Sequence, residues 1–331
     1  MITFVSVATI FRPMKRLTIR YTDFWDYFEP ENFLFTELLS HHFDVTILPD
    51  DSPEASDLLF FSGFGERHLD YFDSVKVFYT GENIVPDFNL CDYGIGFAYL
   101  DFGERYLRFP LYPTYDCYPP MLQGSFFESP AGGPLERRPF CSLVISNYQK
   151  RDPLLFRFEE ELAQYKPIAY GGQYRNNVGG AVEDKIDFIA RYKFNIAFEN
   201  SEGEGYTTEK IMEALYARTV PIYWGNQLIG KEVNPATFIN VHDFDTLDRC
   251  IDYIKRVDSD DRLYRSFLAE SPRLDDRLIP RLDEYLYRIA SAPRRFRPDY
   301  GRTLDYNRMA QCKARMFRNR LLRKLYTPGK P

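Results

Sequence analysis

The stretch KFNIAFENSEGEGYTTEKIMEALYARTVPIYWG, residues 193–225, places two short apolar runs on either side of a helical segment. The runs KFNIAFEN and TVPIYWG are typical of buried strands in a parallel sheet. The segment TTEKIMEALYA between them spaces its apolar residues as a helix does. Because a strand, a helix and a second strand in this order form a parallel βαβ unit, the stretch predicts an α/β fold.

Polar residues gather where the first of these strands ends and the helix begins. Ligands of parallel α/β sheets bind at the carboxyl ends of the strands, and Glu199, Asn200, Glu209 and Lys210 occupy that place. Carboxylates and an amide accept hydrogen bonds from sugar hydroxyls, whereas a lysine and a helix N-terminus attract phosphates. This mixture suits a nucleotide sugar.

A purely structural interpretation accounts for part of the same stretch. Thr207 or Thr208 can cap the helix with its hydroxyl, and Glu209 suits the positive end of the helix dipole. It leaves Glu199, Asn200 and the two glycines of the loop SEGEGY unexplained.

The rest of the chain repeats the alternation of strands and helices in two parts. In the first part, strands are expected at residues 1–11, 16–24, 43–49, 57–62, 76–82 and 93–99, with a helix at 31–42. In the second, strands are expected at 140–146 and 166–172 and helices at 152–165, 183–192 and 246–257. Residues 112–139 are rich in proline and glycine and lack a period, so we expect the domain boundary there. The expected domains are 1–138 and 139–290, two Rossmann-like units that face each other across a cleft, followed by a tail, 291–331.

Composition separates this tail from the body. Residues 291–331 hold 12 lysines or arginines against 2 aspartates, whereas the whole chain carries a net charge of −6. Apolar residues in the tail follow helical spacing, at Met309, Met316, Phe317, Leu321 and Leu325. A basic amphipathic helix suits an anionic membrane surface, and docking on the acidic body is the alternative. Nucleic-acid binding is not expected, because the excess of basic over acidic residues is confined to the tail and the body is acidic.

Two other features of the sequence bear on the class of protein. The 5 cysteines are scattered without CxxC spacing, which favours a reducing compartment over a disulfide framework or a zinc site. The triplet Asp258-Ser259-Asp260 reads as a DxD metal motif, but it lies between two helical segments, where Asp and Ser cap helices. No metal site is expected. The glycines of SGFGER, residues 62–67, lack the third glycine of the dinucleotide fingerprint.

Three blocks of sequence resemble the α-1,3-fucosyltransferase family, which uses GDP-fucose. Residues 192–244 are similar to its signature region. Residues 77–101, followed by RYLRFPLY, are similar to the acceptor-domain segment of the bacterial members, and FCSLVISN with GGQYRNNVGG gives a weaker third match. The resemblance implies a GT-B architecture, with an N-terminal acceptor domain and a C-terminal donor domain, and inversion at the fucose anomeric carbon without a metal or other cofactor.

The resemblance also implies roles for individual residues. Glu82, in TGEN, falls where the family keeps its general base. Asn200, Tyr206, Glu209 and Lys210 fall on donor contacts, with Glu209 on hydroxyls and Lys210 on phosphate.

Three further residues are possible donor contacts. An arginine after the SN dipeptide should meet the diphosphate, and Arg151 is preferred over Arg157. Arg175, in a glycine-rich turn, either approaches the donor or is solvated. Glu199 either orients Asn200 or touches fucose.

The expected reaction is transfer of fucose to a glycan hydroxyl, with O3 of N-acetylglucosamine in N-acetyllactosamine favoured by the resemblance. Transfer of another sugar, or a catalytically silent carbohydrate-binding relative, are the alternatives. No run in the chain reaches the roughly 18 apolar residues of a membrane span. We therefore expect a cytoplasmic protein that acts on an oligosaccharide or glycolipid acceptor, held peripherally at the inner membrane surface by its tail.

Overall fold

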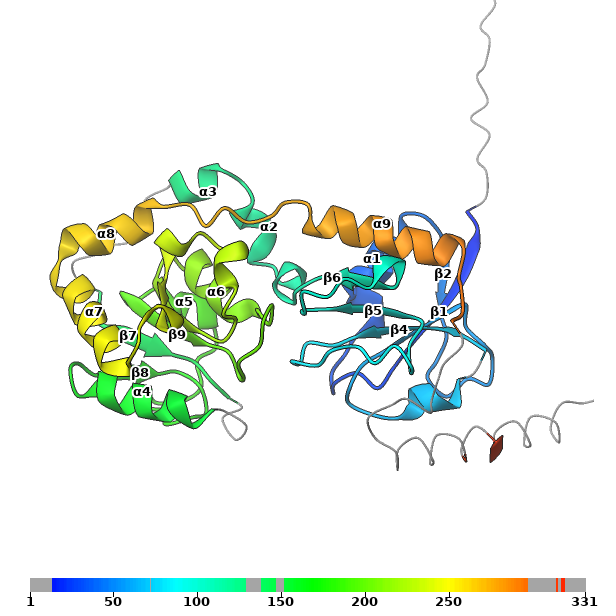
Figure 1. Ribbon diagram of the computed structural model, residues 1–331, viewed down its shortest axis with the longest axis horizontal. Helices are drawn as coiled ribbons and strands as arrows, with labels where there is room; N and C mark the ends of the chain where they lie inside the picture. Colours follow the sequence, from blue (N-terminus) through cyan, green and yellow to red (C-terminus); the bar gives the residue numbers. More distant parts are fainter. Residues whose placement is uncertain are drawn as a thin grey trace, which may run out of the picture. The chain divides into compact units, whose positions relative to one another are not determined.

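The computed structural model describes residues 14–71, 73–128, 138–146 and 152–296, with residues 314, 317 and 318. The chain forms two compact units (Figure 1). Unit 1 takes its described residues from 1–80, 86–94 and 281–331, and unit 2 takes its own from 81–85 and 95–280. The strand expected at 1–11, Arg151 and nearly all of the tail beyond residue 296 lie outside the described residues.

The sheet that begins in unit 1 has the strand order β2-β1-β3-β4-β5-β6. Its strands are β1 (Arg16–Thr22), β2 (Asp44–Ile47), β3 (Leu58–Phe61), β4 (Val75–Tyr79), β5 (Tyr93–Gly96) and β6 (Tyr106–Arg108). The pairs β1–β2, β1–β3 and β3–β4 are parallel, as buried apolar runs predict. All five strands expected between residues 16 and 99 are present. The strand order reverses between β1 and β3.

Among the described residues of unit 1, helices α1 and α9 accompany the strands. Helix α1 (Leu34–Ser40) buries Phe35 and Leu39 completely. Helix α9 (Leu278–Ser291) lies beside the end of α1 (Figure 1), where Asp283 Oδ1 is 3.0 Å from His42 Nε2. The C-terminal helix therefore returns to the first unit, although the sequence placed residues up to 290 in the second domain.

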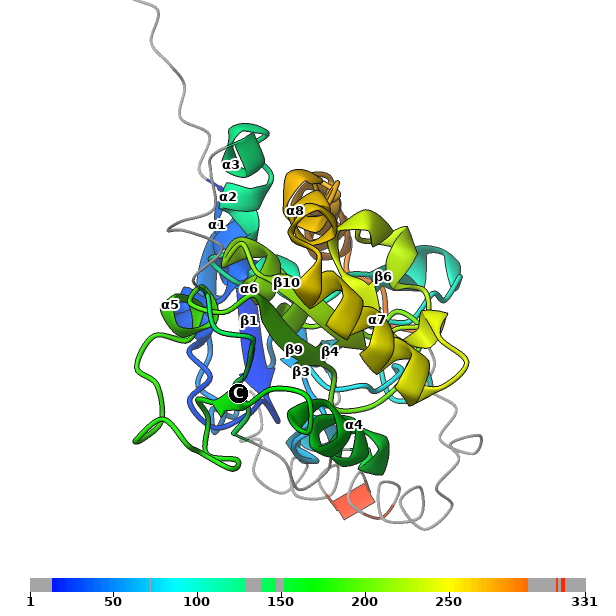
Figure 2. The ribbon, with the colours of Figure 1, turned by 90° about the vertical axis from the view of Figure 1, so that its left-hand side faces the viewer.

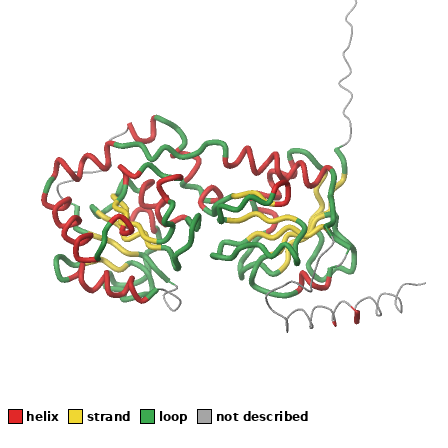
Figure 3. Tube along the Cα trace, in the orientation of Figure 1, coloured by secondary structure: helices red, strands yellow, loops and turns green. Residues whose placement is uncertain are grey.

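Unit 2 contains a five-stranded parallel sheet with the order β11-β10-β9-β7-β8, drawn in yellow in Figure 3. Its strands are β7 (Cys141–Leu143), β8 (Ile168–Tyr170), β9 (Phe194–Phe198), β10 (Val220–Trp224) and β11 (Ile239–Asn240). β7 lies between β8 and β9, so the strand order reverses at the β7–β9 pair. Ligands of such sheets bind outside the carboxyl ends of the strands at this reversal.

Helices cover both faces of this sheet. Figure 2 shows α5 (Lys185–Ile189) and α6 (Glu209–Tyr216) on one side of β9, and α7 (Leu247–Ser259) and α8 (Asp261–Ala269) on the other. On the second side, Phe158 of α4 (Pro153–Ala163), Ile254 of α7 and Tyr264 share one apolar core with the strands. The doubly wound α/β architecture predicted from the sequence is confirmed.

The segment taken as the boundary, residues 112–139, belongs to unit 2 where it is described. It contains α2 (Tyr118–Met121) and α3 (Ser125–Glu128), and the Tyr118 hydroxyl donates to the backbone oxygen of Asp275 over 2.5 Å. The prolines and glycines of this segment therefore indicate irregular backbone, and the described part of the segment still packs within unit 2. The remaining short 3-10 helices are Pro30–Asn32, Arg67–Asp70, Gly103–Arg105, Tyr112–Thr114, Ile229–Lys231, Pro235–Thr237 and Val241–Asp243.

Candidate functional site

A buried carboxylate, Glu199, joins the end of β9 to the start of α6. Its side chain is completely shielded from solvent. Oε1 accepts from the Thr208 backbone N–H at 2.8 Å and from the Tyr223 hydroxyl at 3.4 Å. Oε2 accepts from the Thr208 hydroxyl at 2.6 Å and from Lys210 Nζ at 3.2 Å. A buried carboxylate needs such donors to offset its lost hydration. Glu199, whose role the sequence left open, is thus the anchor of the strand–helix junction.

The same contacts correct the capping prediction. Thr208 does precede α6, but its side chain makes no capping hydrogen bond to the helix. Its hydroxyl donates to Glu199 instead. The same hydroxyl oxygen accepts from Lys210 Nζ at 3.1 Å, so Thr208 connects the carboxylate to the ammonium group.

Lys210 is held between two carboxylates. Its Nζ lies 3.2 Å from Glu199 Oε2, 3.1 Å from Thr208 Oγ1 and 3.8 Å from Glu209 Oε1. Burial alone lowers the pKa of Lys210, but the charges of Glu199 and Glu209 outweigh it and raise that pKa above its usual range. Burial raises the pKa of Glu209, and the charges of Lys210 and Lys185 more than reverse this, so that its pKa is lowered. Lys210 and Glu209 are therefore both ionised at neutral pH.

Lys185 supplies a second ammonium group to this cluster. It begins α5 and forms an ion pair with Glu213 of α6. Lys185, Lys210 and Glu213 line a narrow recess at the ends of β7 and β9. Two cations thus lie at the sheet's strand reversal, which is the place expected to receive an anionic ligand.

A second buried network fixes the loop between Glu199 and Thr208. Asn226 Nδ2 donates to Thr207 Oγ1 at 2.9 Å and to Glu232 Oε1 at 2.7 Å. Asn226 Oδ1 accepts from the backbone N–H groups of Gly205 at 2.7 Å and Leu228 at 2.9 Å. Asn226 is completely buried, so these bonds form away from competing water. Neither Asn226 nor Glu232 was predicted as a site residue.

Two residues from earlier in the chain complete this network. Arg108 donates to Glu232 Oε1 at 2.5 Å and to the backbone oxygen of Gly205 at 3.2 Å. The Tyr99 hydroxyl donates to the same Glu232 oxygen at 3.2 Å, and the Arg108 guanidinium lies 4.0 Å from the centre of the Tyr99 ring. Arg108 belongs to RYLRFPLY, so that block supports the loop and is not merely a strand.

Two glycines, Gly205 in this loop and Gly225 directly after β10, allow close approaches that a side chain would block. Gly205 has φ +86°, and a Cβ there would lie 2.3 Å from the backbone oxygen of Phe97. Gly225 has φ +143°, and a Cβ there would lie 2.5 Å from Glu199 Cγ. Both backbone conformations favour glycine. Gly205 therefore lets the loop pack against Phe97, and Gly225 lets the end of β10 pack against Glu199.

Of the other residues predicted to contact the donor, Tyr206 is the most deeply placed. It is 2% exposed, and its ring meets Phe97 edge-on with 4.8 Å between centroids. Burial and the charge of Glu199 raise the pKa of Tyr206 above its usual range. Asn200 directly follows Glu199 and is partly buried. The structure thus places Asn200, Tyr206, Glu209 and Lys210 on one strand–loop–helix junction.

Glu82 lies beside this junction. Residues 81–85 belong to unit 2, although β4 before them belongs to unit 1. The neighbouring Asn83 donates from Nδ2 to Ser201 Oγ and to the Glu202 backbone oxygen, both at 3.0 Å. Glu82 is exposed, and its charge contributes to the raised pKa of Tyr206. The predicted base therefore lies in the same compact unit as the loop between Glu199 and Thr208.

The candidate arginines lie in surface ion pairs. Arg157 Nε is 2.6 Å from Glu161 Oε1, and its side chain is 68% exposed. Arg175, with φ +47°, is 2.8 Å from Glu160. Arg157 also lines a cavity of about 680 Å³ at the ends of β10 and β11, together with Trp224 and His242. Arg151 lies outside the described residues.

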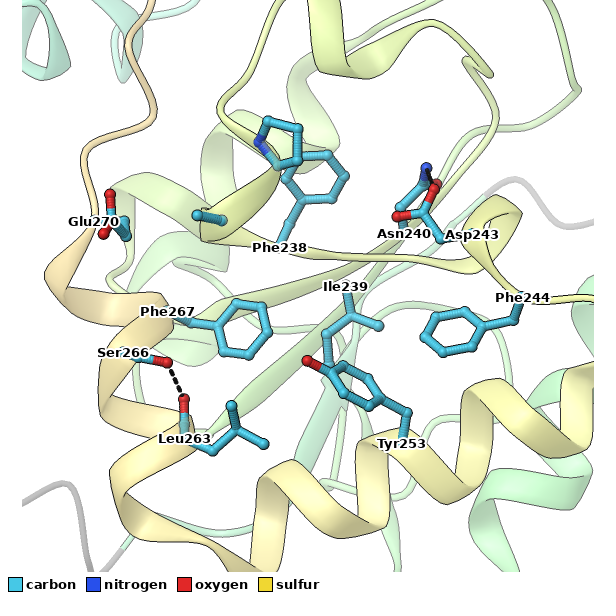
Figure 4. A pocket seen from close by; sticks show the side chains of 12 residues that line it. Phe238, Ile239, Asn240, Asp243, Phe244, Tyr253, Leu263, Ser266, Phe267 and Glu270 are labelled. Atoms are coloured by element: carbon cyan, nitrogen blue, oxygen red, sulfur yellow. Dashed lines mark hydrogen bonds between the residues drawn. The ribbon is translucent and has the colours of Figure 1, made fainter.

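A second cavity, of about 380 Å³, lies at the edge strand β11 (Figure 4). Figure 4 shows the rings of Phe244, Tyr253 and Phe267 around its apolar floor, with Asp243 and Glu270 at its rim. None of the predicted site residues lines it. It is therefore separate from the junction around Glu199.

The DxD-like triplet has two structural roles. Asp260 caps α8 by accepting from the backbone N–H groups of Arg262 and Leu263, both at 3.0 Å, which confirms the capping interpretation. Asp258 is buried and lies 2.8 Å from Lys193 Nζ, and Lys166 also pairs with it. Among the residues with described positions, no group of three or more His, Cys, Asp or Glu side chains is placed to hold a metal ion. Within the same residues, no helix is long and apolar enough to cross a membrane.

Two parallel α/β units, one with a lysine–carboxylate cluster at its strand reversal, define a glycosyltransferase of the GT-B class. Residues 19–115 match the family described as alpha-(1,3)-fucosyltransferase FucT N-terminal domain. Residues 135–273 match the C-terminal part of glycosyltransferase family 10 (fucosyltransferase). The chain belongs to the α-1,3-fucosyltransferase family, and the predicted family is confirmed.

Individual relatives agree with this assignment. An alpha-(1,3)-fucosyltransferase FucT of Helicobacter pylori is 38% identical over 275 residues, which cover 74% of this chain and 57% of the relative. This chain thus spans little more than half of that protein. A crystal structure of an alpha1,3-fucosyltransferase is 32% identical, with a TM-score of 0.74 over 88% of this chain and 94% of that one. A structure described with GDP-fucose is 31% identical, with a TM-score of 0.73 over 90% and 96%.

Replacing Asn226 with leucine should destabilise the protein and loosen the loop. The variant leaves the Gly205 and Leu228 N–H groups without their acceptor, and each buried unsatisfied group costs roughly 1–3 kcal/mol. We expect a loss of at least about 2 kcal/mol in the free energy of unfolding, measured with urea. Asn32→Leu, at an exposed asparagine, is the matched control and should change little. Equal stability of the two variants would contradict the proposed importance of the network.

The buried Asp258 should make stability depend on pH. Burial raises its pKa, but the hydrogen bonds from Lys166 and Lys193 outweigh burial and lower the pKa below the unfolded value. The stabilisation is therefore complete above the unfolded pKa and is lost as the pH falls through the folded pKa. Asp258→Asn should lose stability at pH 7, and the difference from the native protein should shrink below about pH 4. Asp252→Asn, on the exposed side of the same helix, should show no such convergence in urea unfolding from pH 7 to pH 2.5.

Proposed function

We propose that the protein transfers L-fucose from GDP-β-L-fucose to a sugar hydroxyl, with inversion at the anomeric carbon. The observation that carries the proposal is the pairing of Lys210 with Glu199 and Glu209 at the strand reversal of unit 2, in a chain of this family. The similarity to a structure described with GDP-fucose supports this donor. Unit 1 would bind the acceptor, and unit 2 the donor.

Lys210 would bind the diphosphate of the donor. Its ammonium group is fixed by Glu199 and Thr208, so little conformational entropy remains to be lost when the phosphates arrive. Negative charge grows on the departing GDP in the transition state, and a positioned cation together with the α6 N-terminus stabilises it. Arg151 would add a second cation, with Arg157 and Arg175 as the alternatives. This scheme requires no metal ion.

The remaining donor contacts would hold the sugar and ribose hydroxyls. Glu209 accepts hydrogen bonds as an ionised carboxylate, and its lowered pKa keeps it in that form. Asn200 lies next to Glu199 in the same loop and offers both donors and an acceptor. Tyr206 would contribute mainly by filling the wall of the site, since its ring is buried against Phe97.

Glu82 would act as the general base. An inverting transfer is a single in-line displacement, in which the acceptor oxygen bonds to C1 of fucose as the C1–O bond to GDP breaks. The acceptor hydroxyl proton passes to the Glu82 carboxylate, and the electron pair of the broken bond leaves with GDP. The hydrogen bonds of Asn83 to Ser201 and Glu202 support this role, because they hold the base beside the donor loop.

The acceptor of the proposed reaction is N-acetyllactosamine, at O3 of its N-acetylglucosamine. There are two alternatives to this reaction: a different nucleotide sugar as donor, or binding of sugars without turnover. Lys210 and the helix end would bind the diphosphate of any nucleotide sugar, so turnover must be compared between donors to test the first alternative. The second is favoured only if donor binding occurs without product.

Release of GDP tests the function and the base together. We expect GDP release from GDP-fucose to depend on N-acetyllactosamine, and Glu82→Gln to slow it by at least about 100-fold while donor binding persists. Glu37→Gln, at an exposed glutamate of α1, is the control and should match the native protein. Retained activity in Glu82→Gln would remove the base assignment. Tight donor binding without release by the native protein would favour a silent relative.

We also propose that the tail tethers the enzyme to the cytoplasmic face of the inner membrane. Phe296 N–H donates to Asp92 Oδ1 at 2.6 Å, so truncation should begin at residue 297 to leave unit 1 intact. The truncated chain should bind vesicles with 30% anionic lipid much more weakly than the full chain does, because it loses most of the basic residues of 291–331. Turnover of a soluble acceptor should be unchanged. Equal vesicle binding by both chains, measured by co-sedimentation, would refute the tether.

A further inference from the structure

Unit 1 has its own strand reversal, between β1 and β3. Thr22 at the end of β1 pairs with Phe61 at the end of β3. The loops that follow, residues 23–28 and 62–67, therefore start side by side at the carboxyl edge of the sheet. Ligands of parallel α/β sheets bind at this kind of position. The second loop is SGFGER, whose glycines the dinucleotide fingerprint did not explain.

A buried aspartate clasps these two loops together. Asp23 accepts from the backbone N–H groups of Arg67 and His68, both at 2.9 Å, and lies 2.7 Å from His68 Nδ1. Its side chain is 2% exposed. Gly65 permits the contact, because a Cβ there would lie 2.3 Å from Asp23 Oδ1. Gly65 of SGFGER thus allows the hydrogen bonds of Asp23, and these bonds fix the two loops relative to each other.

The clasped loops carry aromatic side chains that the core does not cover. Trp25 and Phe64 meet edge to face, with 6.3 Å between centroids, and Trp25 also contacts Phe28 at 5.2 Å. Phe64 is 50% exposed and Tyr27 is 99% exposed. Two unrelated loops therefore contribute rings to one surface. Exposed rings that gather at a ligand-binding position, instead of scattering over the surface, favour a binding role.

Polar groups accompany these rings. Thr22 Oγ1 and Ser62 Oγ are buried at the two strand ends, and neither has a hydrogen-bond partner among the described residues. Buried hydroxyls are normally satisfied, so a ligand or an ordered water is expected to supply the missing bond. Asp26, between Trp25 and Tyr27, is an exposed carboxylate that can accept hydrogen bonds from hydroxyls.

We propose that Trp25 and Phe64 form the platform on which the acceptor saccharide stacks. This inference rests on the proposed function, because it names the binding surface of that reaction's second substrate. A pyranose ring presents an apolar C–H face, which packs against an aromatic ring, and hydroxyls at its edge, which need polar partners. A neutral disaccharide matches this surface better than a diphosphate does, since Arg67, the cationic residue of the two loops, is paired with Asp50.

Kinetics test the platform against a matched control. Trp25→Ala and Phe64→Ala should each raise the KM for N-acetyllactosamine roughly fivefold to tenfold, with the KM for GDP-fucose unchanged. Tyr287→Ala is the control, because the ring of Tyr287 is 49% exposed, like that of Phe64. It packs beside His42 and Phe43, the two residues that precede β2, and so not on the two loops of the platform. An acceptor KM within twofold of native in both platform variants would overturn the proposal.

Fluorescence gives a readout that does not depend on turnover. The chain has 2 tryptophans, Trp25 and Trp224, so Trp224→Phe leaves Trp25 as the single reporter. In this single-tryptophan protein, N-acetyllactosamine should shift the emission of Trp25 to shorter wavelength in a saturable way. The shift should be the same whether residue 82 is the native glutamate or is changed by Glu82→Gln. The further change Phe64→Ala should weaken the shift. No response to the disaccharide would overturn the platform even if GDP release occurs. A saturable response without GDP release would keep the platform and reject the proposed reaction.

Discussion

The ion pair between Glu199 and Lys210 is the interaction on which the junction of unit 2 depends. Burying either charge alone would be costly, so each requires the other and the hydroxyl and backbone donors around them. The pair connects the first residue after β9 to the second residue of α6, and it thereby fixes the helix start against the sheet. Asn226 and Glu232 also hold the loop between them, through hydrogen bonds to Gly205 and Thr207.

The strand, helix and strand around this pair could be predicted because the spacing of their apolar residues indicates each element. The stretch 193–225 predicted a strand, a helix and a strand, and the structure has β9, α6 and β10 within it. Each apolar run is short and continuous, as expected when both faces of a parallel strand are buried. The positions of Glu209 and Lys210 at the helix start follow from the same pattern.

The supports of the junction could not be predicted, because their partners are distant in the sequence. Arg108 and Glu232 are 124 residues apart, and no local pattern links them. Residues 81–85 join unit 2 through Asn83, and α9 returns to unit 1, so neither unit is one continuous segment. Asp258 illustrates the same limit: its short spacing to Asp260 suggested a motif, yet its actual partners, Lys166 and Lys193, lie 92 and 65 residues away.

The two strand reversals carry different chemistry, and this difference argues for a division of labour. At the β7–β9 reversal of unit 2 the side chains are charged, with Lys185 and Lys210 among carboxylates. At the β1–β3 reversal of unit 1 the rings of Trp25 and Phe64 meet at the surface, and the buried carboxylate of Asp23 holds the two loops together. A cationic cluster stabilises a diphosphate whose charge grows during transfer, whereas an aromatic surface binds a neutral sugar without competing for that charge. If the two surfaces were exchanged, the lysines would lie beside the acceptor and not beside the departing diphosphate, where negative charge develops. The side chains at each reversal therefore limit which substrate it can bind.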